Sequence, residues 1–181
     1  MVSVQDLSVS FGSFDLLTGI SFLINDRDRI GLAGRIASGN STLLRLFAGL
    51  QNPSSGKVDM SAEVTIGYLP QQMKVDDSTT VMKEVIIAFS EVTGLSEEIE
   101  RCSSEIAGRS DYESAEYLKL CDHITVIEER YRILGGSNYI AEAEKTLTGL
   151  GFDRKDFDRP TRELSGGWRM RVELAKILLR K

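Results

Sequence analysis

Residues 34–42, here called the phosphate loop, have the spacing of the phosphate-binding pattern G-x-x-x-x-G-K-[ST] with one departure. The stretch reads Gly34-Arg35-Ile36-Ala37-Ser38-Gly39-Asn40-Ser41-Thr42. Asn40 occupies the position of the lysine in the pattern. A glycine-bearing turn that opens a helix directs backbone N–H groups and the positive end of the helix dipole at an anion. The loop therefore predicts a nucleotide site that lacks its usual full positive charge.

A second stretch that could bind an anion is the Ser-Gly-Gly turn, residues 165–167, which directly precedes an apolar-periodic segment. Two glycines after a hydroxyl residue leave the first N–H groups of a helix accessible. Gln71 follows a predicted strand between the two stretches. Each feature has an ordinary alternative, because many α/β proteins have a tight strand-to-helix turn and many loops precede a helix. The three features in this order are more specific than any one of them.

The elements that must position these residues are mostly strands before residue 70. Alternating apolar residues predict a strand over 2–11, with a bulge where the alternation slips at Gln5-Asp6. Further strands are expected at 20–24, 58–59 and 63–69. We expect residues 29–33 to form a short buried strand that enters the phosphate loop. A helix over 40–49 should leave it.

The rest of the chain is predicted to be helical. Apolar residues recur at steps of three and four over 92–106 and again over 117–134, which favours an antiparallel helical hairpin at about 92–134 with Asp111 capping its second helix. The Ser-Gly-Gly turn opens a last helix that runs to Lys181. We divide the chain into a β lobe with the phosphate loop (1–75), a helical lobe (76–160) and the last turn with its helix (161–181).

The bulk composition restricts the class of protein. The 181 residues have a formal net charge of −5, which is no whole-molecule footprint for nucleic acid. Cys102 and Cys121 lack the spacing of metal ligands, and no apolar run approaches the ~18 residues of a membrane span. The first residues have no basic and apolar signal segment. A cytoplasmic location is expected.

The motifs together resemble a known family. Leu164-Ser165-Gly166-Gly167 looks like the signature of ABC ATPases, and the continuation over 168–175 resembles the ABC-F subfamily. The stretch 66–71 is similar to the Q-loop of that family, and the helical hairpin is similar to its arm. The resemblance implies an α/β P-loop fold with an antiparallel β lobe and an inserted helical lobe. It also implies that the chain stops before the Walker B strand.

The resemblance assigns roles to individual residues and implies ATP and Mg²⁺ as cofactors. Backbone amides from Gly34 to Thr42 would hold the β-phosphate, and Phe11 would stack on adenine. The hydroxyl of Ser41 would ligate Mg²⁺, while Gln71 would approach the metal and the attacking water. ATP would lie between two ATPase domains. The Ser-Gly-Gly turn, made of Ser165, Gly166 and Gly167, would therefore contact a nucleotide held by a second domain, present in the same full-length protein.

Three departures from the family pattern concern activity. Asn40 removes a charge-assisted phosphate contact, which costs on the order of 1.5–3 kcal/mol. Ile36 and Ala37 replace the asparagine and glycine of the family loop, and Ala37 costs about 1 kcal/mol if its φ is positive. The metal-binding Asp, catalytic Glu and switch His of the family do not occur before Lys181, and His123 is no substitute. We therefore expect an impaired phosphate loop.

The implied action is that of a translation factor or ribosome-protection ATPase. The hairpin from Val92 to Leu134 has five basic and ten acidic residues, a balance opposite to the one that binds RNA phosphate. Arg109, at the expected tip, is the one well-placed cation, so the ribosome as a partner follows from the resemblance alone. Two alternatives stay open: the ATPase subunit of an ABC transporter, and an inactive fragment or pseudo-ATPase.

Overall fold

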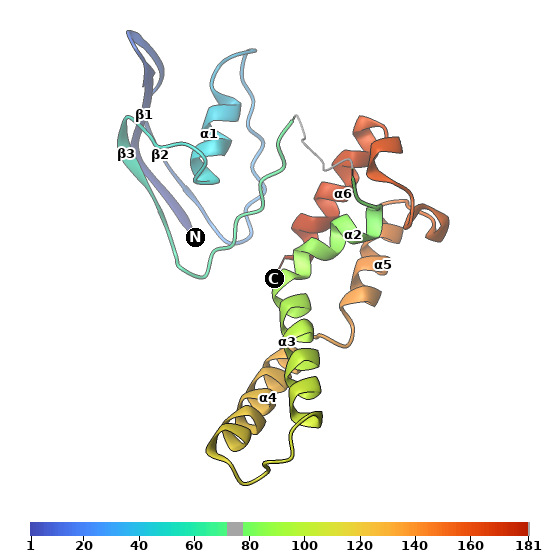
Figure 1. Ribbon diagram of the computed structural model, residues 1–181. Coiled ribbons are helices and arrows are strands. Elements are labelled where there is room, and N and C mark those ends of the chain that lie inside the picture. The colour runs from blue at the N-terminus through green and yellow to red at the C-terminus, as the bar shows by residue number, and fades with distance from the viewer. Residues whose placement is uncertain (72–77, 181) are drawn as a thin grey trace. The chain divides into compact units, whose positions relative to one another are not determined.

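The computed structural model describes residues 1–71 and 78–180 and forms two compact units, Met1–Tyr68 and Leu69–Lys181 (Figure 1). The first unit contains a small sheet and one helix, and the second consists of helices. Among the described residues, none of the helices is both long and apolar enough to cross a membrane. Each unit is described by itself below.

The sheet of the first unit is antiparallel, with three strands in the order β2-β1-β3. Its strands are β1 (Val2–Phe11), β2 (Phe14–Ile24) and β3 (Ser55–Met60). The predicted bulge is confirmed, because the β1–β2 register shifts between Val4 and Leu7 and Asp6 has a φ of 46°. Gly56 is required opposite this bulge, since a Cβ there would lie 2.3 Å from the carbonyl oxygen of Asp6.

Helix α1 (Asn40–Phe47) covers one face of this sheet. Its apolar residues Leu43 and Leu46 are buried together with Val4, Leu7 and Val9 of β1. The ring of Phe22 meets that of Phe47 edge to face, with 6.0 Å between centroids. This small core holds α1, and with it the phosphate loop, against the strands.

Two predicted strands are wrong. Residues 29–33 and 63–69 have no strand conformation, and Ile30, Leu32 and Ile66 are 59%, 45% and 38% exposed. Apolar content predicts burial, but a strand also needs a neighbour that accepts and donates its backbone hydrogen bonds. Within the described part of the chain, the sheet of the first unit consists of β1, β2 and β3, and neither stretch pairs with it.

The second unit is helical, as the apolar spacing predicts. Its elements are α2 (Val81–Ile86), η1 (Ile87–Phe89), α3 (Ser90–Ala107), α4 (Ala115–Ile133), α5 (Tyr139–Gly149), η2 (Arg154–Asp156), η3 (Thr161–Glu163) and α6 (Gly166–Leu179). Helices α2, α5 and α6 share a core with the loops between them, and Val81, Val85, Ala143, Leu147 and Val172 are fully buried in it.

Helices α3 and α4 form the predicted antiparallel hairpin (Figure 1). Arg130 Nε donates to Glu91 at 2.9 Å near one end, and His123 lies 2.8 Å from Glu98 further along. The second helix is capped by Ser114, whose hydroxyl accepts from the N–H of residue 117 at 3.0 Å. Our expectation of Asp111 as the cap is wrong, because that carboxylate is bound by its neighbour Arg109 at 2.6 Å.

The exit of the hairpin is fixed by Tyr131. Its hydroxyl donates to the carbonyl oxygen of Gly136 at 2.6 Å. A Cβ on Gly136 would lie 2.3 Å from the Tyr131 ring, so only glycine fits there. At the other end, α3 follows α2 and η1 without a break.

Candidate nucleotide-binding site

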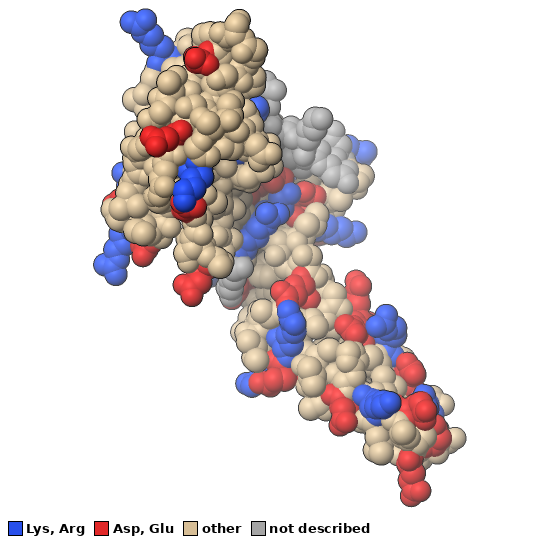
Figure 2. Space-filling model, turned by 90° about the vertical axis from the view of Figure 1, so that its left-hand side faces the viewer, with Lys and Arg blue, Asp and Glu red and all other residues tan. Residues whose placement is uncertain are grey.

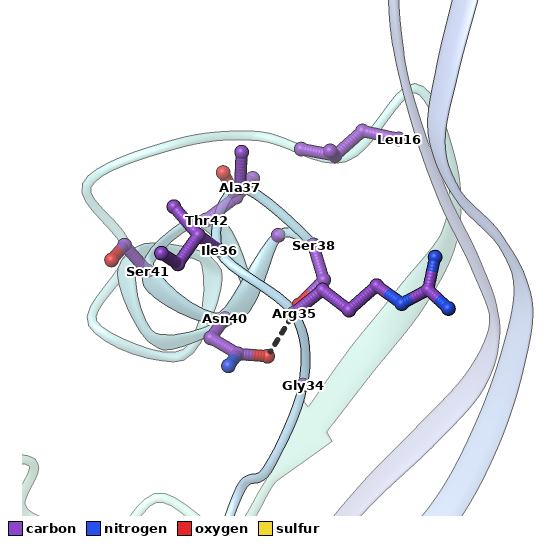
Figure 3. Close-up of a pocket in the computed structure, with 10 residues that line it drawn as sticks. Leu16, Gly34, Arg35, Ile36, Ala37, Ser38, Asn40, Ser41 and Thr42 are labelled. Carbon is purple, nitrogen blue, oxygen red and sulfur yellow. Dashed lines mark hydrogen bonds between the residues drawn. The ribbon is translucent and has the colours of Figure 1, made fainter.

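The phosphate loop surrounds a hollow of about 510 Å³ (Figure 3). The hollow is lined by residues 34–42 and by Leu16 of β2. All the residues predicted for phosphate binding are therefore contiguous around one open space. Leu16 was not predicted, although the β1–β2 register leaves it as an extra residue between the pairs Val9↔Leu17 and Ser10↔Asp15.

Backbone N–H groups at the start of α1 supply the positive potential of this hollow. The first helical hydrogen bond runs from the N–H of Leu43 to the carbonyl oxygen of Gly39, at 2.9 Å. The N–H groups of Asn40, Ser41 and Thr42 precede it and have no acceptor within the helix. The first turn of α1 contains no acidic residue. The arrangement suits an anion such as phosphate.

Two glycines allow the loop to close in this way. A Cβ on Gly34 would lie 2.3 Å from the hydroxyl of Ser38 and 3.2 Å from the side-chain oxygen of Asn40. Gly39 has a φ of 95°, and a Cβ there would lie 2.9 Å from Leu17. The loop therefore rests directly on β2, and the positive φ of Gly39 favours glycine at that position.

Asn40 points back into the loop. Its side-chain oxygen accepts a hydrogen bond from the Ser38 hydroxyl at 3.3 Å (Figure 3). An asparagine at this place contributes dipoles but no charge. Arg35, the cation within the loop, is exposed, and its side chain extends away from Ser41 (Figure 3). The loop thus relies on backbone N–H groups.

Two residues of the loop are in unfavourable settings: Ala37 has a strained backbone, and Ile36 has an exposed apolar side chain. Ala37 has a φ of 66°, the left-handed region that disfavours any residue with a Cβ. From the sequence we expected Ala37 to destabilise the loop only if its φ is positive, and its φ is positive. Ile36 is 103% exposed, so its apolar side chain gains nothing from burial. Ala37 therefore raises the free energy of this conformation relative to a loop with glycine at that position.

The Ser-Gly-Gly turn opens α6 in the second unit. Ser165 occupies the cap position of this helix but makes no side-chain cap hydrogen bond. The first helical bond runs from the N–H of Arg169 to the carbonyl oxygen of Ser165 at 3.0 Å. The N–H groups of Gly166, Gly167 and Trp168 therefore lie before it. A hollow of about 770 Å³ adjoins this start, lined by Gln71, Leu164, Gly166, Gly167, Arg169, Met170 and Arg171.

Side chains of α6 bind the segment that precedes the turn. Arg169 donates from Nε to the carbonyl oxygen of Leu164 and from Nη2 to that of Arg162, both at 3.1 Å. The guanidinium of Arg171 lies 4.4 Å from the centroid of the Trp168 ring. Deeper in the helix, Lys176 Nζ donates to Glu84 of α2 at 2.6 Å. Lys176 also pairs with Glu173, one turn earlier.

The predicted site residues lie in both units. Phe11, at the end of β1, and the phosphate loop belong to the first unit, whereas Gln71 and the Ser-Gly-Gly turn belong to the second. Phe11 is 56% exposed. Sequence reasoning missed Arg169, which binds two backbone carbonyl oxygens shortly before it in the chain. It also missed Lys176, whose partner Glu84 lies 92 residues away.

The site offers few metal ligands of its own. Among residues 1–71 and 78–180, no group of three or more His, Cys, Asp or Glu side chains could hold a metal ion. The exposed Ser41 hydroxyl is a side-chain oxygen in the first turn of α1, among the residues that line the hollow. Mg²⁺ that accompanies a nucleotide keeps phosphate and water ligands, so a hydroxyl is a suitable protein ligand.

The expected RNA-facing cation of the hairpin is already paired. Arg109 Nε and Nη2 both donate to Asp111, at 2.9 and 2.6 Å, and the hydrogen bond from Arg109 holds the pKa of Asp111 well below its usual value. Acidic and basic side chains alternate along the hairpin, in the lower part of the molecule (Figure 2). The hairpin therefore presents mixed charge rather than a basic stripe.

Comparisons with known proteins agree with these motifs. The family model described as "ABC transporter" matches residues 17–181. ABC transporter F family member 5 of Arabidopsis thaliana is 29% identical over 180 residues, which are 98% of this chain and 26% of that protein. The tylosin resistance ATP-binding protein TlrC of Streptomyces fradiae is 33% identical over 98% of this chain and 32% of its own length. The chain thus spans about a quarter to a third of these relatives.

Solved structures share the fold. A dimeric ATP-binding cassette in a post-hydrolysis state, bound to ADP and Pi, has a TM-score of 0.59 and 19% sequence identity, and the match covers 99% of this chain and 70% of that one. At this identity the likeness shows the fold alone. It confirms the fold class predicted from the sequence.

Proposed function

Since this chain belongs to the ABC transporter family, we propose that it is part of an ATPase domain of an ABC-F protein that binds ATP with Mg²⁺ and acts on the ribosome. The ABC-F resemblance stated from the sequence is confirmed by relatives that match along almost its whole length. The observation that carries nucleotide binding is the phosphate loop, which combines an open hollow with unpaired N–H groups at the start of α1.

In this proposal the β-phosphate lies against the N–H groups of residues 39–42, and the Ser41 hydroxyl is the protein ligand of Mg²⁺. Mg²⁺ neutralises charge on the phosphates when it is bound. Gln71 and the Ser-Gly-Gly turn serve the γ-phosphate side of a nucleotide, the turn acting on one that a second ATPase domain holds. That second domain is proposed because the relatives are three to four times as long as this chain.

We further propose that the phosphate loop is impaired. Asn40 lacks the charge that a lysine brings to the β- and γ-phosphates, and the strained Ala37 disfavours the loop conformation. Backbone N–H groups alone still attract phosphate, but without the charge-assisted contact. Weak binding of ATP and little stabilisation of a transition state are expected.

An equilibrium titration with Mg²⁺ and either ATP or inorganic triphosphate tests this proposal. Asn40→Lys should tighten binding of both about 10- to 100-fold, the equivalent of about 1.5–3 kcal/mol. Asn52→Lys, in an exposed turn of the same unit, adds the same charge away from the loop and should leave binding unchanged. Adding Ala37→Gly to Asn40→Lys should tighten binding further.

Two outcomes contradict different parts of the proposal. If Asn40→Lys and the unchanged chain bind triphosphate equally tightly, the phosphate loop is not impaired. If neither of them binds triphosphate, the loop is not a nucleotide site. A gain in Asn52→Lys equal to that in Asn40→Lys assigns the effect to overall charge.

The ribosome, and with it a cytoplasmic location, is proposed from the ABC-F relatives. Cosedimentation of the chain with ribosomes tests it at two salt concentrations. Because Arg109 is paired with Asp111, Arg109→Ala should change cosedimentation little. A steep salt dependence that Arg109→Ala reduces would show an RNA contact at the tip of the hairpin, contrary to this expectation.

A further inference from the structure

A buried polar cluster lies where α2 meets the segment that leads into α6. Within residues 1–71 and 78–180, the buried polar or charged side chains are those of Glu84 (4% exposed) and Thr161 (0% exposed). The Thr161 hydroxyl donates to the backbone carbonyl oxygen of Thr79 at 3.1 Å, and the Thr79 hydroxyl donates to Oε2 of Glu84 at 3.1 Å. A buried polar group is costly unless it is hydrogen-bonded, so the cluster restricts how these two segments can pack.

Backbone hydrogen bonds fix the same segment on the start of α2. The first N–H groups of α2 have no acceptor within the helix, and they donate to carbonyl oxygens of residues 157–159 at 2.9 and 3.1 Å. Thr80 and Pro160 form an isolated antiparallel bridge beside them. The N–H of Thr161 donates at 2.9 Å to the carbonyl oxygen of Thr79, the same oxygen that its hydroxyl binds. Thr161 therefore completes a small ladder between the two segments.

The Ser-Gly-Gly turn lies between two attachments to α2. Thr161 precedes the turn by four residues, and the N–H of Leu164 donates back to its carbonyl oxygen at 3.1 Å. On the other side of the turn, Lys176 Nζ donates to Oε1 of Glu84 at 2.6 Å. Helices α2 and α6 pack against each other along this contact (Figure 1). The start of α2 thus binds the chain both before and after the turn.

We propose that Thr161 is a positioning residue for the Ser-Gly-Gly turn. Its hydroxyl fixes where the turn begins, and thereby the place at which the N–H groups of residues 166–168 meet an anionic ligand. The inference rests on the proposed role of the turn toward nucleotide phosphate and adds the residue that sets the position of the turn. Thr161 is fully buried, so it acts through the backbone rather than by contact with the ligand.

A hydroxyl positions the turn more closely than an apolar side chain of similar size would. Apolar contacts are non-directional, whereas a hydrogen bond is satisfied only within a narrow range of distance and angle. A valine at position 161 would fill nearly the same volume but would fix the turn less closely along α2. Gln71 lines the same hollow as Gly166 and Gly167, so a shift of the turn would also change its distance from Gln71.

A titration with Mg²⁺ and inorganic triphosphate, followed by the NMR shifts of individual amides, tests this inference. The midpoints at residues 166–168 and at residues 40–42 are read separately in one experiment. Thr161→Val should raise the midpoint at the turn about three- to tenfold, the loss expected for one hydrogen bond, and leave the midpoint at the phosphate loop unchanged. Thr161→Ser keeps the hydroxyl and should keep both midpoints.

Two controls separate positioning from a general loss of stability. Val85→Ala removes part of a fully buried side chain from the same core but no hydrogen bond, and it should leave the midpoint at the turn unchanged. Thr93→Val removes a hydroxyl that donates to a backbone carbonyl oxygen of α3 at 3.2 Å, and it should leave that midpoint unchanged as well. Thermal unfolding shows whether each variant is folded. If Thr161→Val is unfolded, Thr161→Cys, whose thiol is a weaker donor, takes its place with the same expected direction.

The outcomes distinguish this inference from the proposed function. An unchanged midpoint at the turn in Thr161→Val overturns the inference, and so does an equal rise in Thr161→Ser or Val85→Ala. If the amides of residues 166–168 do not respond to triphosphate in the unchanged chain, the inference fails, whereas a response at residues 40–42 still supports the phosphate loop as a nucleotide site. If residues 40–42 respond neither in the unchanged chain nor with Asn40→Lys, that nucleotide site fails, and the response at the turn alone decides the role of Thr161.

Discussion

The two helix starts of this molecule offer the same backbone chemistry in different settings. At α1 the unpaired N–H groups follow a loop with an exposed Ile36 and a strained Ala37. At α6 they follow the buried Leu164, and Arg169 binds the carbonyl oxygens of Leu164 and Arg162 just before the turn. The first start depends on a small core of one helix on three strands, whereas the second belongs to the larger core of α2, α5 and α6.

The comparison teaches that free N–H groups alone do not define a binding site. Their geometry persists only if neighbouring side chains hold the turn in place, and the two units do this to different degrees. The Ser-Gly-Gly turn should be rigid before any ligand arrives, while the phosphate loop adopts its conformation at a cost and should be the less rigid of the two. The following predictions test this difference, from the largest expected effect to the smallest.

Replacing Lys176 by methionine should cost the most. The side chains of Lys176 and Glu84 are only 12% and 6% exposed, so the change leaves two carboxylates near α6 without their cation. We expect the free energy of unfolding to fall by about 3–5 kcal/mol, measured by urea denaturation. The double variant Lys176→Met/Glu84→Leu should recover most of it. A small loss in the single variant would mean that α6 does not depend on this pair.

Arg169→Met should lower the free energy of unfolding by about 1–3 kcal/mol. Two backbone carbonyl oxygens next to the Ser-Gly-Gly turn lose a hydrogen bond to a charged donor. Arg45→Met, on the exposed face of α1, should have almost no effect and is the matched control. Equal losses in the two variants would remove the distinction between a braced and an unbraced helix start.

Ala37→Gly should stabilise the first unit by about 1 kcal/mol. The substitution removes the cost of a Cβ at a φ of 66°. Ala48, with a φ of −73°, is the control, because Ala48→Gly should be neutral or destabilising. Thermal unfolding of both variants measures the difference. A loss of stability in Ala37→Gly would show that the loop does not adopt this backbone conformation without ligand.

Alkaline pH should lower the stability that the Lys176 ion pairs give to α6. This is the smallest of the expected effects near neutral pH. Burial lowers the pKa of Lys176, but hydrogen bonds to Glu173 and Glu84 outweigh it and raise the pKa above 10.5. The contribution of Lys176 to the free energy of unfolding is therefore complete below the pKa of lysine in the unfolded state. It is lost as the pH rises through the pKa of Lys176 in the folded state. Melting temperatures from pH 8 to 11.5 should fall more steeply than in Lys176→Met/Glu84→Leu. Parallel curves would contradict this linkage.

Local patterns in the sequence predicted most of the elements. The slip in alternation at Gln5-Asp6 correctly indicated a bulge, and the apolar spacing of 117–134 indicated a helix that packs on one face. These features depend on residues that are neighbours in the chain. The glycines of the phosphate loop were likewise predictable from the spacing of the pattern, although a Cβ on Gly39 would contact Leu16 and Leu17 of β2 rather than residues near it in the chain.

Interactions between distant residues could not be predicted in the same way. Residues 29–33 are apolar enough for a buried strand, but no pattern within them says whether a neighbouring strand will pair with them. Lys176 and Glu84 are 92 residues apart, and their meeting depends on how α2 and α6 pack. The sequence also cannot show that Asn40 bonds to Ser38, since that contact follows from the side-chain orientation in the folded loop.

The Tyr131–Gly136 contact has a mechanical consequence. It ties the end of α4 to the segment that leads into α5, while α3 is joined to α2 without a break. Because both of its connections to the second unit are fixed, the hairpin should move as a rigid body with that unit rather than bend at its base. Force applied at its tip, near residues 108–114, would then be transmitted to the helices that carry the Ser-Gly-Gly turn.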